Sequence, residues 1–168
     1  MDLLVIRHAI ATERVEGADD HDRPLTGRGI KRMKAAVRGL DNFGIEIARV
    51  LHSPWRRAVE TAELLEPIVR GRLADAMIST EHLIGSPRAE LLAQLAEHGV
   101  VGSVAVVGHE PWLGELIALL TFGDARVGES IPLKKGGVAW LDGSSAPGGM
   151  TLRALLPPRL LRIAGKAH

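Results

Sequence analysis

Residues 3–9 read LLVIRHA and residues 103–111 read SVAVVGHEP, two stretches in which an apolar run leads to a histidine. Runs of Val, Ile and Leu of this length are typical of strands buried inside a parallel sheet. The first run ends in Arg7 and His8, and the second leads to His109. Open α/β sheets build their active sites outside the carboxyl ends of the strands. The two runs therefore predict a sheet that brings both histidines to one site.

The composition bounds the class of protein. With 168 residues, 46% of them hydrophobic, the chain can bury one substantial core, and we expect a single domain over residues 1–168. The formal charge of +1 results from 21 basic and 20 acidic residues, which gives no indication of a nucleic-acid partner. The absence of cysteine excludes disulfides and thiolate metal sites. The opening MDLLVIRHA fits neither a secretory signal nor a membrane span, so we expect a cytoplasmic protein without a membrane partner.

Strand and helix patterns alternate along the chain. Apolar runs predict four buried strands, at residues 2–7, 48–52, about 75–80 and 103–108. Helical spacing predicts four helices, over residues 26–40, from 53 to Pro67, from 86 to Gly99, and after Pro111. The stretch GGVAWLDGSSAPGGMTLRALLP, residues 136–157, predicts a β-hairpin. We therefore expect a three-layer α/β/α sandwich, with a mostly parallel sheet and an antiparallel edge.

Helix ends also carry signals. Ser53-Pro54 and Ser86-Pro87 each predict a helix start, with serine as the N-cap and proline at the first helical position. The helix over residues 26–40 is amphipathic, and its outer face is predicted to be basic, with Arg28, Lys31, Arg32, Lys34 and Arg38.

Polar residues cluster where the predicted strands end. Besides Arg7 and His8, these are residues 53–57, Glu81 and His109. Helix N-termini at the same edge favour an anion, and the planar fork of an arginine matches two phosphoryl oxygens. A neutral His8 could attack phosphorus and become a phosphohistidine, while Arg7, Arg57 and His109 stabilise the transition state. No metal-site spacing of carboxylates accompanies them, so we expect metal-free transfer without a cofactor.

Four motifs, in order and spacing, resemble the histidine phosphatase superfamily and, within it, the short phosphohistidine phosphatases of the SixA type. They are Arg7-His8, RPLTGRG at 23–29, SPWRRAVET at 53–61 and VVGHEP at 106–111, and the resemblance covers residues 1 to about 120. It implies a phosphoglycerate-mutase-like fold with His8 as the phosphorylated nucleophile. It also implies that Arg7, Arg57 and His109 complete the phosphate pocket.

Departures from the family pattern bear on the substrate. Ala9 stands where most members carry glycine, an expected asparagine is missing, and the segments over the pocket are short. A shallow site favours phosphohistidine on a protein partner of the histidine-phosphotransfer type. The alternatives are a phosphatase for small phosphate esters and, less favoured, a non-catalytic phosphate-binding or phosphoprotein-binding module. Glu81 lies about where mutase-like members carry a proton donor, with a solvent-facing carboxylate as the alternative.

Other charged and aromatic residues have competing interpretations. The motif spacing selects Arg57 for the pocket rather than Arg56, and Arg23 either binds substrate or pairs with the acidic stretch 13–22. Trp55 and Trp112 are expected in the core, with contact to substrate at the pocket rim as the alternative. The histidines outside the motifs are expected at the surface or in packing, namely His21, His52, His82, His98 and His168. The basic residues near the C-terminus are expected to be solvated, with an acidic partner as the minor alternative, namely Lys134, Lys135, Arg159, Arg162 and Lys166.

Overall fold

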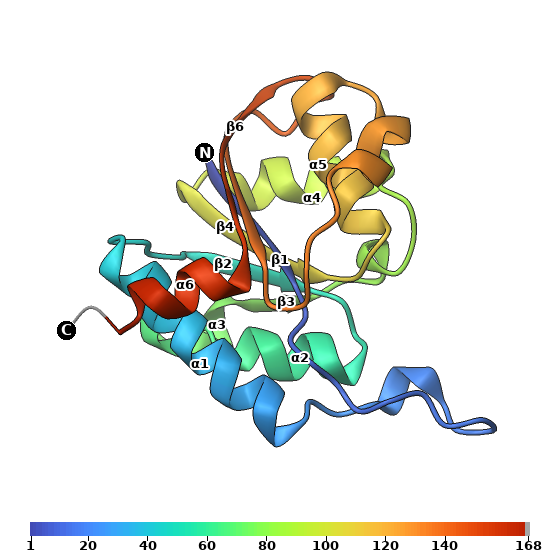
Figure 1. Ribbon diagram of the computed structural model, residues 1–168. Coiled ribbons are helices and arrows are strands. Elements are labelled where there is room, and N and C mark those ends of the chain that lie inside the picture. Colours follow the sequence, from blue (N-terminus) through green and yellow to red (C-terminus); the bar gives the residue numbers. More distant parts are fainter. Residues whose placement is uncertain (167–168) are drawn as a thin grey trace.

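The structure, a computed structural model, describes residues 1–166, so His168 lies outside the described residues. A six-stranded sheet runs through its centre, in the order β3-β2-β4-β1-β5-β6 (Figure 1). The strands are β1 (Asp2–Arg7), β2 (Arg49–His52), β3 (Met77–Ser79), β4 (Ser103–Gly108), β5 (Val138–Gly143) and β6 (Met150–Leu156). The first four are parallel, and the hairpin of β5 and β6 adds the antiparallel edge. The predicted fold class is confirmed.

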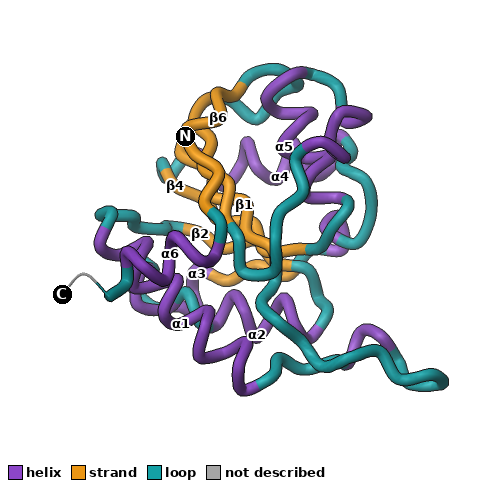
Figure 2. Tube along the Cα trace, in the orientation of Figure 1, coloured by secondary structure: helices purple, strands orange, loops and turns teal. Residues whose placement is uncertain are grey.

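Helices and loops connect the strands (Figure 2). The α-helices are α1 (Gly27–Asn42), α2 (Arg56–Glu63), α3 (Leu73–Ala76), α4 (Ala89–Gly99), α5 (Trp112–Phe122) and α6 (Pro158–Ala164). Short 3₁₀ helices are η1 (Asp20–Asp22), η2 (Glu66–Ile68), η3 (Glu81–Leu83) and η4 (Ala125–Ser130). Within the described residues, no helix is both long and apolar enough to span a membrane.

The two faces of the sheet carry separate cores, because side chains alternate along a strand. In β1, Leu3 and Val5 face a core built with α4 and α5, whereas Leu4 and Ile6 face a core built with α1, α2 and α6. Figure 1 shows these two helical layers on opposite sides of the sheet. All four β1 side chains are buried, as the continuous apolar run predicts.

The register of β1 against β4 places the two histidines at one edge. Arg7 lies opposite Gly108, and the His8 amide donates to the Gly108 carbonyl at 3.1 Å. The helix after β1 covers one face of the sheet and the helix after β4 covers the other. Such a switch between neighbouring strands opens a crevice at their carboxyl ends. The fold therefore positions His8 and His109 at this crevice.

Two predicted helix starts are wrong. Helix α2 begins at Arg56 with Trp55 as its N-cap, and α4 begins at Ala89 with Arg88 as its N-cap. Ser53 lies before the N-cap of α2, and its hydroxyl bonds to the His109 ring at 2.8 Å and accepts from the Trp55 amide at 3.2 Å. Both Ser-Pro pairs instead lie in the turns that precede the helices.

The predicted end of the second helix is also too late. Helix α2 ends at Glu63, and Pro67 lies in η2 rather than just beyond the helix. Since α2 is followed directly by this 3₁₀ segment, the helical spacing of the sequence continues past the true end of the α-helix.

Helix α6 was not expected, although Pro158 at its first position is a start signal. It packs against α1, where Leu161 is buried. A Cβ added to Gly39 of α1 would collide with the Leu161 carbonyl oxygen. Glycine therefore allows the two helix backbones to approach closely.

We expect Gly39→Ala to lower the free energy of unfolding by about 2 kcal/mol, because the added methyl forces α6 away from α1. Urea unfolding followed by circular dichroism measures it. Gly27→Ala is the matched control in the same helix, because a Cβ at Gly27 meets no atom within 4 Å. Equal stability of the two variants would show that the close approach is not needed.

Candidate active site

His8 follows β1 and is buried, with 5% of its surface exposed. Its Nδ1 lies 2.7 Å from the carbonyl oxygen of Ala9. Because a carbonyl only accepts, Nδ1 carries the proton in this hydrogen bond. The neutral ring therefore keeps its lone pair on Nε2, which is the form that can attack an electrophile.

The surroundings keep both histidines neutral. Burial lowers the pKa of His8 to about 4, and the charges of Arg57, Arg7 and Lys135 act in the same direction. Burial also lowers the pKa of His109 to about 3, followed by the effects of His8 and Arg57. Cationic groups that disfavour an imidazolium also favour an anionic guest. The site thus combines two neutral imidazoles with the positive charge of nearby arginines.

His109 lies beside His8, with their ring centroids 5.2 Å apart. Its Nε2 is 2.8 Å from the Ser53 hydroxyl, which accepts from the Trp55 amide. The hydroxyl can therefore direct its own proton to Nε2, and this leaves Nδ1 as the protonated nitrogen of His109. Nδ1 is buried, and no atom within residues 1–166 forms a hydrogen bond with it. His109 Nδ1–H is therefore a donor without a partner among the described residues.

Arg57, in the first turn of α2, is 3% exposed. Its guanidinium donates to the Asp20 carbonyl at 2.6 Å and to the Asp20 carboxylate at 3.0 Å. It also lies 4.5 Å above the centre of the Trp55 ring, within range of a cation–π interaction. Asp20 belongs to η1 in the long loop between β1 and α1, so this loop fixes the orientation of the arginine.

A carboxylate that the sequence analysis did not single out organises the surroundings of Arg7. The Arg7 guanidinium donates to the Leu133 carbonyl at 2.7 Å. The Leu133 amide donates to one oxygen of Glu110 at 2.5 Å, and the Gly114 amide donates to the other at 3.0 Å. Glu110 thus ties the segment that contacts Arg7 to the start of α5.

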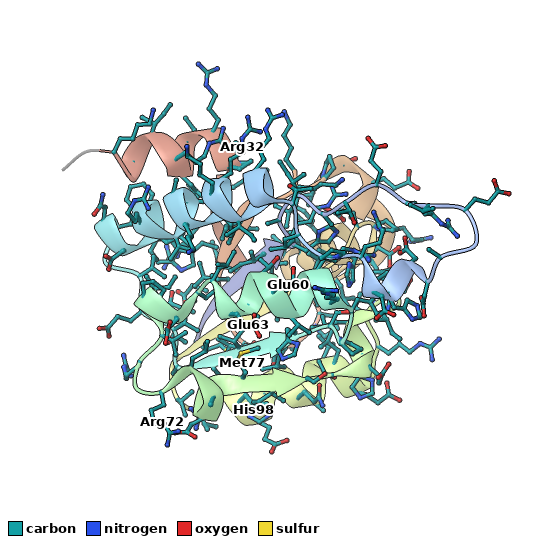
Figure 3. The ribbon with its side chains drawn as sticks, turned by 90° about the horizontal axis from the view of Figure 1, so that it is seen from below. Arg32, Glu60, Glu63, Arg72, Met77 and His98 are labelled. Carbon is teal, nitrogen blue, oxygen red and sulfur yellow. The ribbon has the colours of Figure 1, made fainter. Side chains whose placement is uncertain are left out.

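The other two candidate arginines lie in ion pairs. Arg23 pairs with Asp20 at 2.8 Å, so it joins the acidic stretch, which was one of its two predicted fates. Arg56 is exposed and pairs with Glu60 of α2 at 2.7 Å; Figure 3 labels Glu60. Of the two adjacent arginines, only Arg57 is buried.

Glu81 is exposed at the start of η3. This segment lies near the end of β4, since a Cβ built on Gly108 would come within 3.8 Å of the Leu83 carbonyl oxygen. In the described part of the chain, no hydrogen bond or ion pair joins Glu81 to His8, Arg57 or any other pocket residue. Its role as a proton donor stays a prediction.

Aromatic side chains gather around His109 and Trp55. Trp55 lies 4.4 Å from His109 and stacks on His21 at 4.6 Å, and Trp112 lies 6.3 Å from His109, all between ring centroids. The expectation that both tryptophans lie in the core is wrong, because they are half-buried. Each tryptophan directly follows a proline at the start of its helix. Both indoles lie beside the His109 ring.

Thr61 links two parts of the site. Its hydroxyl accepts from the Ala9 amide at 3.0 Å and donates to the Arg57 carbonyl at 2.6 Å. The sequence contained a signal for this residue, since Thr61 is the last residue of the SPWRRAVET motif.

The site shows no metal-binding geometry within residues 1–166, where no three His, Asp or Glu side chains gather closely enough to hold an ion.

We expect the low pKa values of the two histidines to make folding sensitive to acid. The ordinary value is 6.5, so below this pH the unfolded chain takes up protons that the folded chain rejects until about pH 4. Stability present above pH 6.5 is therefore lost as the pH falls. The free energy of unfolding should drop by about 3 kcal/mol between pH 6.5 and about pH 5, measured by urea titration.

The control for this acid sensitivity is the double variant His8→Asn, His109→Asn. It should show a much smaller loss over the same pH range, because neither replacement titrates there. A loss as large as that of the unmodified chain would assign the acid sensitivity to other groups.

Comparisons with known proteins show which family the chain resembles. The sequence pattern of the histidine phosphatase superfamily (branch 1) matches residues 3–75. The chain is 33% identical over 132 residues to the phosphohistidine phosphatase SixA of Escherichia coli, covering 74% of this chain and 76% of that protein. It is also 34% identical over 151 residues to an uncharacterized protein of Picosynechococcus, covering 87% of each.

A solved structure shows the same fold. The protein histidine phosphatase SixA, complexed with tungstate, superposes with a TM-score of 0.78 at 26% identity and covers 96% of this chain and 99% of that one. The sequence similarity extends over most of the chain, and the structural similarity over nearly all of it. The chain belongs to branch 1 of the histidine phosphatase superfamily and is a phosphatase.

Proposed function

We propose that the chain removes phosphoryl groups from phosphohistidine on a protein partner, without a metal, through a phosphohistidine intermediate on His8. The observation that carries this proposal is the hydrogen bond from His8 Nδ1 to the Ala9 carbonyl, at 2.7 Å. It directs the lone pair of Nε2 toward reaction in a pocket that contains Arg7, Arg57 and His109. These residues provide the charge stabilisation that phosphoryl transfer requires.

The proposed hydrolysis has two steps. In the first, Nε2 of His8 attacks phosphorus, the bond between phosphorus and the donor nitrogen breaks, and the donor imidazole leaves with a proton. In the second, water attacks the phosphohistidine, releases phosphate and restores neutral His8. Arg7, Arg57 and the Nδ1–H of His109 hold the equatorial oxygens in both steps. Arg23 acts on this pocket through Asp20, which it shares with Arg57.

Two features support phosphohistidine as the substrate. The relatives named SixA are a phosphohistidine phosphatase and a protein histidine phosphatase, and the solved one binds tungstate, a tetrahedral oxyanion like phosphate. A phosphorylated imidazole can also take its proton from solvent before it leaves, whereas an alkyl phosphate needs an acid as its bond breaks. An exposed Glu81 outside the hydrogen bonds of the pocket suits the first kind of leaving group.

Rapid-quench trapping tests the intermediate. A peptide carrying ³²P-labelled phosphohistidine is mixed with the protein and quenched within one turnover. We expect label on the protein that is stable in alkali and lost in acid, as a phosphohistidine is, and no label on His8→Ala. Saturable binding of the peptide without label and without turnover would support a binding module instead.

A substrate panel tests the substrate class. The phosphohistidine peptide should show a higher kcat/KM than a phosphoserine peptide or glucose 6-phosphate. A higher kcat/KM for the sugar phosphate would identify a phosphatase for small esters. Activity should be unchanged by a chelator, and its loss would overturn the metal-free step.

A further inference from the structure

A cavity of about 560 Å³ opens beside the nucleophile, between α1, α6 and the segment that precedes β5. Ala9 and Lys135 line its inner end, and they are respectively the neighbour of His8 and one of the charges that lower the His8 pKa. The Gly136 amide donates to the carbonyls of Arg7 and His8 at 3.1 and 3.2 Å, which holds this segment against the active site. The cavity therefore reaches the residue that follows His8.

A second cavity, of about 680 Å³, extends the first along α1 and α6. The two share Arg32, Arg159, Arg162 and Ile163, so they form one depression, which we call the α1/α6 groove. Figure 3 shows Arg32 on α1 beside α6. From Arg28 to Arg38 the groove follows about 15 Å of helix.

The rim of the groove is strongly basic. Helix α1 contributes Arg28, Lys31, Arg32 and Arg38. The segment before β5 and the region of α6 contribute Lys134, Lys135, Arg159, Arg162 and Lys166. No acidic residue lines either cavity, and within the described residues none of these nine cations forms an ion pair.

The crowding of like charges is visible at Arg32. Desolvation lowers its pKa, and the positive charges of Arg28 and Arg162 lower it further. Elsewhere on the surface, Arg70, Arg72 and Arg153 each have an acidic partner in the same chain. The positive charge of the groove is thus left for a partner to neutralise.

The groove also exposes apolar surface between its cations. Leu160 and Ile163 of α6 are each 55% exposed, and Met33 and Ala36 of α1 lie beneath them as part of the core. A helical face with apolar side chains flanked by cations matches a partner helix with apolar side chains flanked by carboxylates.

We propose that the α1/α6 groove binds an acidic amphipathic helix of the protein that carries the phosphohistidine. This inference rests on the proposed function, and it adds the part of the substrate that is recognised. The groove reaches Ala9, the residue after His8, so a helix seated in it would bring a neighbouring phosphohistidine close to His8. The length of the groove, about 15 Å, suits a helix of several turns better than a small anion.

Other polyanions fit less well. Single-stranded nucleic acid is held by stacking on aromatic rings, and among residues 1–166 no aromatic side chain lines either cavity. A lipid bilayer binds to the apolar face of an amphipathic helix that can lie in the membrane plane, whereas Leu160 and Ile163 lie in a concave surface flanked by α1. The acidic helix uses both the charge and the apolar floor.

Two synthetic phosphohistidine peptides test the proposal. One has a helical tail of about 15 residues with Glu and Leu on one face, and in the other every Glu is replaced by Gln. At low ionic strength we expect kcat/KM about tenfold higher for the Glu peptide, mainly through KM. The preference should vanish at about 1 M salt, where the Debye length is about 3 Å.

A charge-neutralised variant localises the effect. Arg38→Gln, Arg159→Gln, Arg162→Gln should remove the preference for the Glu peptide and leave the kcat for the Gln peptide unchanged. The matched control, Arg70→Gln, Arg72→Gln, Arg153→Gln, loses the same charge outside the groove and should keep the preference. A preference that survives the first variant, or that the control also loses, would overturn the proposal.

A single thiol gives an independent reading, because the chain has no cysteine. A photo-crosslinker on Leu160→Cys should capture the tail of the Glu peptide, and one on Arg72→Cys should not. Equal capture at both sites would contradict the assigned surface, as would tighter binding to RNA or to anionic vesicles than to the Glu peptide. Hydrolysis of the Gln peptide tests the proposed function separately, since it requires only the active site.

Discussion

Replacing His8 with alanine is expected to lower kcat/KM for a phosphohistidine peptide by about 10⁴-fold or more. The variant loses the atom that bonds to phosphorus, so both steps of the reaction are blocked. Water attacking a phosphoryl group held by Arg7, Arg57 and His109 accounts for any residual rate. Phosphate release at saturating and at low peptide concentration measures the loss.

Anion binding distinguishes a loss of the chemical step from a loss of the folded structure. The His8→Ala protein should bind tungstate, measured by calorimetry, because the anion-binding groups remain. His98→Ala is the matched control, since His98 lies on α4 outside the hydrogen bonds of the site, and its activity should stay within twofold. An activity of His8→Ala within tenfold of the unmodified chain would remove His8 as the nucleophile.

The strands at the centre of the sheet could be predicted because a strand buried on both faces needs a continuous run of apolar residues. The four central residues of β1 and of β4 are buried and apolar, and Arg7 and His109 mark the carboxyl ends of the two runs. The parallel arrangement then brings His8 and His109 to the same edge. The position of a histidine that directly follows such a strand can therefore be predicted from the strand alone.

The contacts that orient the site could not be predicted in the same way. Ser53 meets His109 across 56 residues, Asp20 meets Arg57 across 37, and Glu110 meets Leu133 across 23. Each depends on how loops fold over the sheet, which local patterns do not encode. Ser53 shows the difficulty clearly, because its sequence signal is that of a helix cap while its hydroxyl bonds to a pocket histidine.

The basic face illustrates a different limit. The periodicity of residues 26–40 predicted the cations on α1, and the cations near the C-terminus were expected to be solvated. Helix α6 went unrecognised, so nothing in the sequence brought these two sets together. Gly39 and Gly165 let the backbones of α1 and α6 approach closely. This packing brings the cations of both helices to one depression.

Arg57→Ala is expected to lower kcat/KM by about 10²- to 10³-fold, the loss typical of removing one donor to a transition-state oxyanion. The variant removes a buried guanidinium whose charge acts on His8, and it leaves the Asp20 carboxylate paired with Arg23 alone of these two arginines. Most of the loss should appear in kcat, because charge on the equatorial oxygens is held most tightly in the transition state.

The neighbouring arginine is the control that the chain itself provides. Arg56→Ala removes the same charge one residue away, from an exposed ion pair with Glu60, and should change kcat/KM by less than about threefold. Arg57→Lys should recover less than a tenth of the lost activity, since a lysine keeps the charge but cannot donate to Asp20 and to a phosphoryl oxygen through one rigid fork. If Arg56→Ala were the more damaging variant, or lysine restored full activity, the pocket would depend on net charge rather than on the geometry that η1 imposes on Arg57.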